Sequence, residues 1–238
     1  MFIQYGEKET AYLKNRDRQL GAAIDCIGHI QRSTESDLFS SIIRHIIGQQ
    51  ISIHAQDTIW QRLCEKSDSV SAKSICALEL NTLQRLGMTF KKAEYIREFA
   101  EKVRDGKFDL RALSELPDAE VIKELTTLKG VGKWTAVMVM IFCMKRPDIV
   151  SYGDLAIRRG MRMLYQHREL DQNKFAKHAK CYSPYGTVAS LYLWAIARGA
   201  VPELKDPAKK RKHLNKTVEK SICQGKQTKR SPAAGKQY

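Results

Sequence analysis

The sequence lacks the patterns that mark several classes of protein. Its six cysteines include no C-x-x-C pair, and its six histidines show no metal-ligand spacing, so neither a zinc nor an iron–sulfur site is indicated. No apolar run approaches the roughly 18 residues that a membrane helix needs. The opening residues, MFIQYGEKET, do not join a basic to an apolar region as a secretory signal does. We therefore expect an intracellular protein with reduced thiols and no membrane partner.

Alternating apolar and polar residues, which mark half-buried strands, are also absent, whereas helical spacing occurs almost throughout. Residues 38–47 carry one apolar stripe, with Ser36 or Asp37 suited to cap the start of that helix. Ser52 can cap the next helix, and Gly87 can follow the end of a later one. The other stretches with helical spacing are 93–103, 117–125, 135–144, 155–164 and 187–197. The sequence predicts an all-α protein.

Positive charge dominates the chain, with a formal net charge of +15. From Glu203 onward there are eleven Lys or Arg and three acids, a net of +8, so the rest of the chain carries +7. Both parts are basic, and an excess of this size favours a polyanionic partner, most simply nucleic acid. The last stretch lacks apolar periodicity, which predicts a mobile tail.

A tight turn and an isolated acid stand out between residues 128 and 160, LKGVGKWTAVMVMIFCMKRPDIVSYGDLAIRRG. Gly130-Val131-Gly132 separates two helical patterns, and glycine permits both positive φ and close backbone approach. Such a turn points the free N–H groups of the second helix outward, where they can hold a phosphate oxygen. Asp154 opens the next helix, so it is either a helix cap or a catalytic carboxylate. Together these features suggest chemistry on nucleic acid.

The spacing L-x-G-V-G-x-W-T-A, followed by G-D-L-A-I-R-R-G, resembles the helix-hairpin-helix DNA glycosylase superfamily. Within it the chain is most similar to the 3-methyladenine DNA glycosylase II branch, which repairs alkylated bases. Residues 46–52 (IIGQQIS) and 86–96 (LGMTFKKAEYI) also agree with the family, and the resemblance covers about residues 10 to 200. Four motifs in the family's order make the resemblance specific, although a lone G-V-G would be weak.

The resemblance implies a two-lobed helical core with the substrate cleft between the lobes. One lobe would span residues 34–116, and the other residues 117–203, with the N-terminal segment 1–33 packed against it and 204–238 as the basic tail. Relatives of the bacterial type often carry an extra α/β domain before these motifs. Only 47 residues precede Gly48, so we do not expect that domain here.

The resemblance also implies the chemistry. Asp154 would stabilise the positive charge that develops on the sugar as the N-glycosidic bond breaks; whether it also deprotonates water stays open. Bifunctional relatives carry a Schiff-base lysine where this chain has Trp134. Lys133 stands one residue earlier, and a shift of about 100° around the helix points its amine elsewhere. The chain therefore resembles a monofunctional enzyme with water as nucleophile, and Lys133 would contact a phosphate.

Four residues are implied in the base pocket, where aromatic rings facing a cationic methylated purine gain ~0.5–2 kcal/mol. Packing in the core is the alternative for each of them, and the family often has Tyr where Met138 stands. Asp154 is preceded by Ser151-Tyr152-Gly153 instead of the family's usual second small or acidic residue and Pro, which argues against a second assisting carboxylate. The pocket residues are Trp134, Met138, Tyr152 and Trp194.

The implied contacts with DNA comprise the hairpin, the end of the 38–47 helix and a lysine pair. We prefer Gln50 as the wedge that fills the gap left by an extruded base. For Gln49 the equal alternative is a polar side chain that is solvated at the end of the helix. The lysines would touch phosphates, or else form an ordinary solvated face. The residues are Gln49, Gln50, Lys91, Lys92, Gly130, Val131, Gly132, Lys133 and Thr135.

One metal is implied, a monovalent cation held by the backbone carbonyls of Thr126, Leu128 and Val131. No other cofactor is expected. Some relatives carry a four-cysteine iron–sulfur loop near the C-terminus, but only Cys181 and Cys223 lie in that part of this chain.

The sequence thus predicts a monofunctional glycosylase that hydrolyses the N-glycosidic bond of alkylated, 3-methyladenine-type bases in duplex DNA for base excision repair. We expect a monomer, cytoplasmic in a bacterium or nuclear in a eukaryote. A glycosylase for oxidised or mismatched bases is the nearest alternative. A non-catalytic helix-hairpin-helix DNA-binding module is the other; it would need the hairpin and the basic surface but not Asp154.

Overall fold

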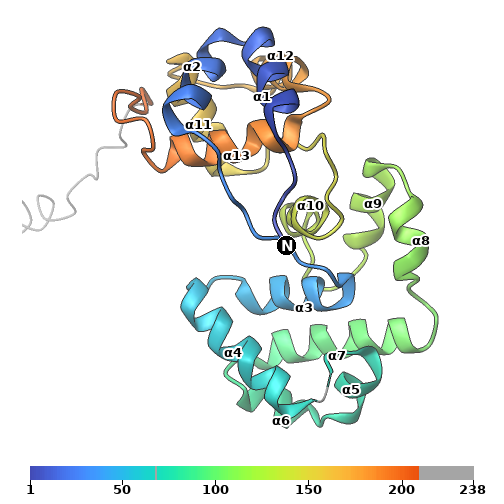
Figure 1. Ribbon diagram of the computed structural model, residues 1–238. Coiled ribbons are helices and arrows are strands. Elements are labelled where there is room, and N and C mark those ends of the chain that lie inside the picture. Colours follow the sequence, from blue (N-terminus) through green and yellow to red (C-terminus); the bar gives the residue numbers. More distant parts are fainter. Residues whose placement is uncertain (68, 209–238) are drawn as a thin grey trace, which may run out of the picture. The chain divides into compact units, whose positions relative to one another are not determined.

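A computed structural model describes residues 1–67 and 69–208, and this part of the chain is helical (Figure 1). It contains thirteen helices and no strand beyond a single antiparallel bridge between Phe2 and Ser33. The all-α prediction is therefore confirmed. The helices are α1 (Glu7–Arg16), α2 (Arg18–Ile27), α3 (Leu38–Gly48), α4 (Ile53–Lys66), α5 (Ala72–Ala77), α6 (Leu80–Arg85), α7 (Phe90–Arg104), α8 (Leu110–Glu115), α9 (Asp118–Leu125), α10 (Lys133–Phe142), α11 (Leu155–Tyr165), α12 (Gln172–Tyr182) and α13 (Gly186–Ala197).

All thirteen helices belong to one unit, Met1–Pro207. The mobile tail predicted for 204–238 lies outside the described residues from 209 onward. None of the described helices has both the length and the apolarity that crossing a bilayer takes.

Local side-chain chemistry accounts for the ends of several helices. Asp37 accepts a hydrogen bond from the Ser40 N–H at the start of α3, and Ser52 caps α4 in the same way through the Ala55 N–H. Gly87 follows α6 with φ at +118°, as expected of a glycine just beyond a helix end. These caps agree with the sequence predictions.

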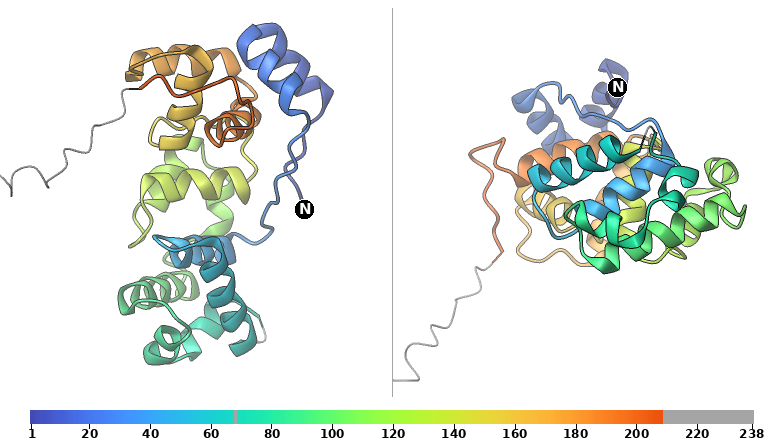
Figure 2. Two further views of the ribbon diagram at one scale, coloured as in Figure 1. Left: turned by 90° about the vertical axis from the view of Figure 1, so that its left-hand side faces the viewer. Right: turned by 90° about the horizontal axis from the view of Figure 1, so that it is seen from below.

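The buried apolar side chains form two clusters. One runs from Phe39 to Ile149 and includes the inner faces of α3, α7, α9 and α10. The other joins α1 and α2 to α11, α12 and α13, and Figure 2 shows the two N-terminal helices beside the C-terminal ones. Trp194 packs against both clusters. The domain boundary at 116/117 stays a prediction, and α9 and α10 share their core with the helices that precede them.

Helices α11 and α13 approach very closely at Gly160. A Cβ atom at this position would lie 2.1 Å from the backbone oxygen of Leu193, far inside contact distance. Only a glycine allows the two backbones to pack this tightly. The contact places the start of α11, with Asp154, near the middle of α13, with Trp194.

Gly160→Ala should therefore lower the free energy of unfolding by about 1–3 kcal/mol, because backbone must move to accept the methyl group. Alanine has the higher helix propensity by about 1 kcal/mol, so a loss of stability can only come from the packing. Urea denaturation measures the change. Gly153→Ala is the control, since its Cβ would meet no atom closer than 3.6 Å. Equal stability of both variants would contradict the tight contact.

Candidate active site

Asp154 begins α11 and is almost completely buried, with 5% of its surface exposed. Its Oδ1 atom accepts hydrogen bonds from the backbone N–H groups of Ala156 and Ile157, both at 2.8 Å. Asp154 is therefore a genuine helix cap, the plainer of its two interpretations. The cap also fixes the carboxylate in one orientation, which a catalytic role would require as well.

Two indole rings from different helices meet on this carboxylate. Trp134, in the first turn of α10, donates its Nε1–H to Oδ2 of Asp154 at 2.7 Å. Trp194 on α13 donates its Nε1–H to Oδ1 at 3.3 Å, and its ring stacks on Phe142 with the centroids 5.8 Å apart. Two residues predicted as pocket aromatics are thus brought together on the predicted catalytic acid. Trp134 is 49% exposed, so core packing does not explain its position.

The other two predicted pocket residues have different surroundings. Met138 is buried within the core around α10. Tyr152 packs edge-on against Phe175 of α12, with the ring centroids 5.2 Å apart, and the guanidinium of Arg158 lies 5.0 Å from its ring centre. The pocket roles of Met138 and Tyr152 stay predictions.

The hairpin between α9 and α10 uses its two glycines differently. Gly130 has φ at +81°, and a Cβ there would lie 2.3 Å from the Tyr95 ring of α7. Gly132 has φ at −87°, caps α10, and has no atom within 4 Å of the place a Cβ would take. Only Gly130 thus uses the positive φ that glycine permits. Open space around Gly132 leaves the first N–H groups of α10 approachable.

Side chains of α3 and α7 hold the hairpin in place. Gln49, at the end of α3, donates from Nε2 to the Gly130 carbonyl at 2.6 Å and to the Thr135 hydroxyl at 3.4 Å. Lys129 forms an ion pair with Glu98 of α7 at 2.9 Å. Gln49 is therefore occupied by the protein itself, and Thr135 is buried.

Several of the residues predicted to contact DNA are exposed, as a DNA-binding surface would require. Gln50 is exposed and has φ at +59°, a strained conformation for a residue other than glycine. Lys133 and Lys91 are also exposed. Val131 buries its side chain in the core, so only its backbone could contact DNA. Gln49 is turned to the hairpin, and the wedge role of Gln50 stays a prediction.

Lys92 has a role that sequence reasoning missed. Its Nζ atom donates to the carbonyl oxygens of Ile47 at 2.8 Å and Gln49 at 2.6 Å. These hydrogen bonds give partners to carbonyl groups at the end of α3, which lack donor partners within the helix. Partial burial lowers the pKa of Lys92. No local signal marks this contact, because its partners lie more than 40 residues away in the sequence. A phosphate contact by Lys92 stays a prediction.

Metal sites receive little support from side chains. Across residues 1–67 and 69–208, no group of three or more His, Cys, Asp or Glu side chains is arranged to hold an ion. Cys181 is a free thiol, and Cys223 lies outside the described residues. The Leu128 carbonyl accepts the Val131 N–H at 3.0 Å and keeps a second lone pair. A cation on the carbonyls of Thr126, Leu128 and Val131 is compatible with this geometry and stays a prediction.

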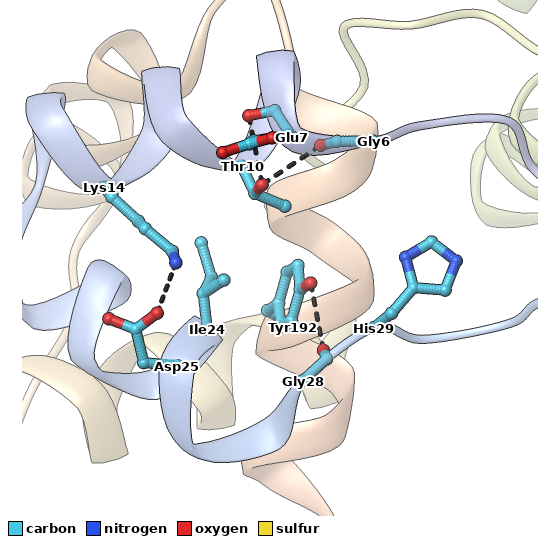
Figure 3. A pocket seen from close by; sticks show the side chains of 9 residues that line it. All are labelled: Gly6, Glu7, Thr10, Lys14, Ile24, Asp25, Gly28, His29 and Tyr192. Atoms are coloured by element: carbon cyan, nitrogen blue, oxygen red, sulfur yellow. Dashed lines mark hydrogen bonds and ion pairs between the residues drawn. The ribbon is translucent and has the colours of Figure 1, made fainter.

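A separate cavity of about 270 Å³ lies between α1, α2 and α13 (Figure 3). The ion pair of Lys14 and Asp25 borders it, and the Tyr192 hydroxyl donates to the Gly28 carbonyl at 3.1 Å. None of the residues predicted for catalysis or DNA binding lines this cavity. The candidate site is therefore the one around Asp154.

Comparisons with known proteins point to one family. The profile of the family described as HhH-GPD superfamily base excision DNA repair protein matches residues 43–184. DNA-3-methyladenine glycosylase 1 of Schizosaccharomyces pombe is 26% identical over 214 residues, covering 87% of this chain and 93% of the relative. A putative DNA-3-methyladenine glycosylase of Bacillus subtilis is 28% identical over 66% of this chain, which spans only 58% of that relative. The solved DNA-3-methyladenine glycosidase of Bacillus halodurans superimposes with a TM-score of 0.74 at 32% identity, covering 83% and 92% of the two chains.

Proposed function

Because the chain belongs to the HhH-GPD superfamily of base excision DNA repair proteins, we propose that it is a monofunctional DNA glycosylase for alkylated bases of the 3-methyladenine type. One observation carries the proposal: a buried carboxylate, Asp154, held by two indole N–H groups from separate helices. A module that only bound DNA could use Asp154 as a helix cap, but it would have no use for the two indole donors on the carboxylate.

The reaction we propose begins with DNA on the hairpin. Backbone N–H groups at the start of α10 hold a phosphate, and the exposed Gln50 occupies the space of the extruded base. Extrusion costs a few kcal/mol, least for a damaged and weakly paired base. The partner is duplex DNA with a damaged base, and the protein acts as a monomer.

The chemical step breaks the bond between C1′ of the sugar and the nitrogen of the base. The bonding electron pair leaves with the base, and the positive charge that develops on the sugar is stabilised by the carboxylate of Asp154. A water oxygen then bonds to C1′ and releases its proton. No amine attacks, since Trp134 stands where a Schiff-base lysine would be needed.

The preference for alkylated bases has two supports. The relatives named above are called DNA-3-methyladenine glycosylases or glycosidases. In addition, Trp134 is half-exposed, and an indole ring that stacks on a methylated, cationic purine gains ~0.5–2 kcal/mol.

A panel of duplexes, each with a single modified base, tests the substrate. We expect release of 3-methyladenine or another N-alkylated purine and little release of 8-oxoguanine or mismatched bases, as measured by chromatography of the freed base. Preferential release of an oxidised or mismatched base would contradict the proposed substrate. Binding of every duplex without release would favour a non-catalytic module.

A further inference from the structure

The two oxygens of Asp154 are held very differently. Oδ1 accepts two backbone N–H groups at 2.8 Å and the Trp194 indole at 3.3 Å. Among the described residues, Oδ2 has one hydrogen-bond donor, the Trp134 indole at 2.7 Å. A carboxylate oxygen offers about two lone pairs, so Oδ1 is saturated whereas Oδ2 keeps one free. Oδ2 is thus the oxygen that can face a substrate, and Trp134 is the one donor that holds it directly among the described residues.

The exposure of Trp134 makes this contact unusual. A ring that served only as core would be buried, and a ring that served only as a wall for the base would not need its N–H directed at an acid. Nearly half of the Trp134 surface is exposed, yet its N–H is held at a charge-assisted distance from a buried carboxylate. The third tryptophan, Trp60 on α4, lies instead beneath the guanidinium of Arg44, 5.7 Å from its ring centre.

We infer that Trp134 is a positioning residue that acts through its indole N–H, which holds Oδ2 of Asp154 in a fixed alignment. This role is additional to any stacking on the base. Its kinetic consequences rest on the proposed function, whereas the hydrogen bond itself does not.

Trp134→Phe separates the two roles, because phenylalanine keeps an aromatic face and removes the donor. We expect the single-turnover rate constant for base release to fall about tenfold or more. Affinity for abasic-site DNA should stay within about twofold.

Trp194→Phe and Trp60→Phe are matched controls of the same chemical change. Trp194 donates over a longer distance to an oxygen that already has two donors, so its rate loss should be smaller. Trp60→Phe should behave as wild type. A Trp134→Phe enzyme with the wild-type rate of base release would overturn the inference, as would an equal loss of rate in Trp194→Phe.

Nuclear magnetic resonance of the three ¹⁵N-labelled indoles tests the contact without any assay of activity. Asp154→Asn can keep Oδ1 as the helix cap, while its NH₂ group replaces Oδ2 and cannot accept from Trp134. We expect the Trp134 N–H to exchange slowly in the wild type, despite its exposed ring, and to shift and exchange faster in Asp154→Asn. The Trp60 signal should stay in place.

An unmoved Trp134 signal in Asp154→Asn would overturn the inference at its root. If the signal moves but no duplex of the panel loses a base, the positioning contact stands and the proposed activity is wrong. The two failures are thereby distinguished.

Discussion

Asp154→Asn should lower base excision by a factor on the order of 10² or more while leaving DNA affinity near the wild-type value. The loss follows from removal of the preorganised negative charge next to the sugar. The fold should survive, since asparagine is as good a helix cap as aspartate and can still accept from the N–H groups of Ala156 and Ile157. Single-turnover excision and a binding titration measure the two quantities.

Asp171→Asn provides the matched control. Asp171 caps α12 through the Lys174 N–H, so the same substitution changes a cap that has no part in the site. Its excision rate should equal the wild-type rate. If purified Asp154→Asn excises at nearly the wild-type rate, Asp154 has no catalytic role and the binding-module alternative gains support.

Gly132→Val should weaken binding to every duplex about tenfold or more, with damaged and undamaged DNA affected alike. Gly132 has an ordinary φ and open space at its Cβ, so a side chain fits the protein but covers the N–H groups that would approach phosphate. The loss of a glycine cap costs about 1 kcal/mol of stability at most. Fluorescence anisotropy with both duplexes, together with circular dichroism, measures the effect.

Gly130→Ala is a comparison variant in which the added side chain should disturb the protein itself and not only its contact with DNA. Its φ of +81° and the Tyr95 ring 2.3 Å from the Cβ position mean that alanine should destabilise the hairpin itself. Unchanged affinity of a folded Gly132→Val protein for both duplexes would show that the hairpin does not contact DNA.

Features set by neighbouring residues could be predicted from the sequence. The helices predicted at 38–47, 93–103, 117–125, 135–144, 155–164 and 187–197, the caps at Asp37 and Ser52, and the hairpin follow from periodicity and capping chemistry. No separate prediction covers α1, α2, α8 and α12. The sequence predicts that Asp154 is either a helix cap or a catalytic acid. In the structure it caps α11, and its two indole donors also suit a catalytic acid.

Contacts between distant segments could not be predicted. The hydrogen bond from Gln49 to Gly130 spans 81 positions, and that from Lys92 to Ile47 spans 45. The direction of the Trp134 N–H depends on where α11 places Asp154, which in turn depends on the packing at Gly160. Such contacts arise from the three-dimensional arrangement of helices, about which periodicity carries no information.

One measurement addresses the central claim, hydrolysis of the N-glycosidic bond without an amine nucleophile. The enzyme is incubated with a duplex that carries one N-alkylated purine, with and without borohydride, and the strands are analysed before and after alkali. We expect release of the base, strand cleavage only after alkali, and no adduct with borohydride, because no imine forms. A trapped adduct that disappears in Lys133→Ala, or the absence of any released base, would contradict the account.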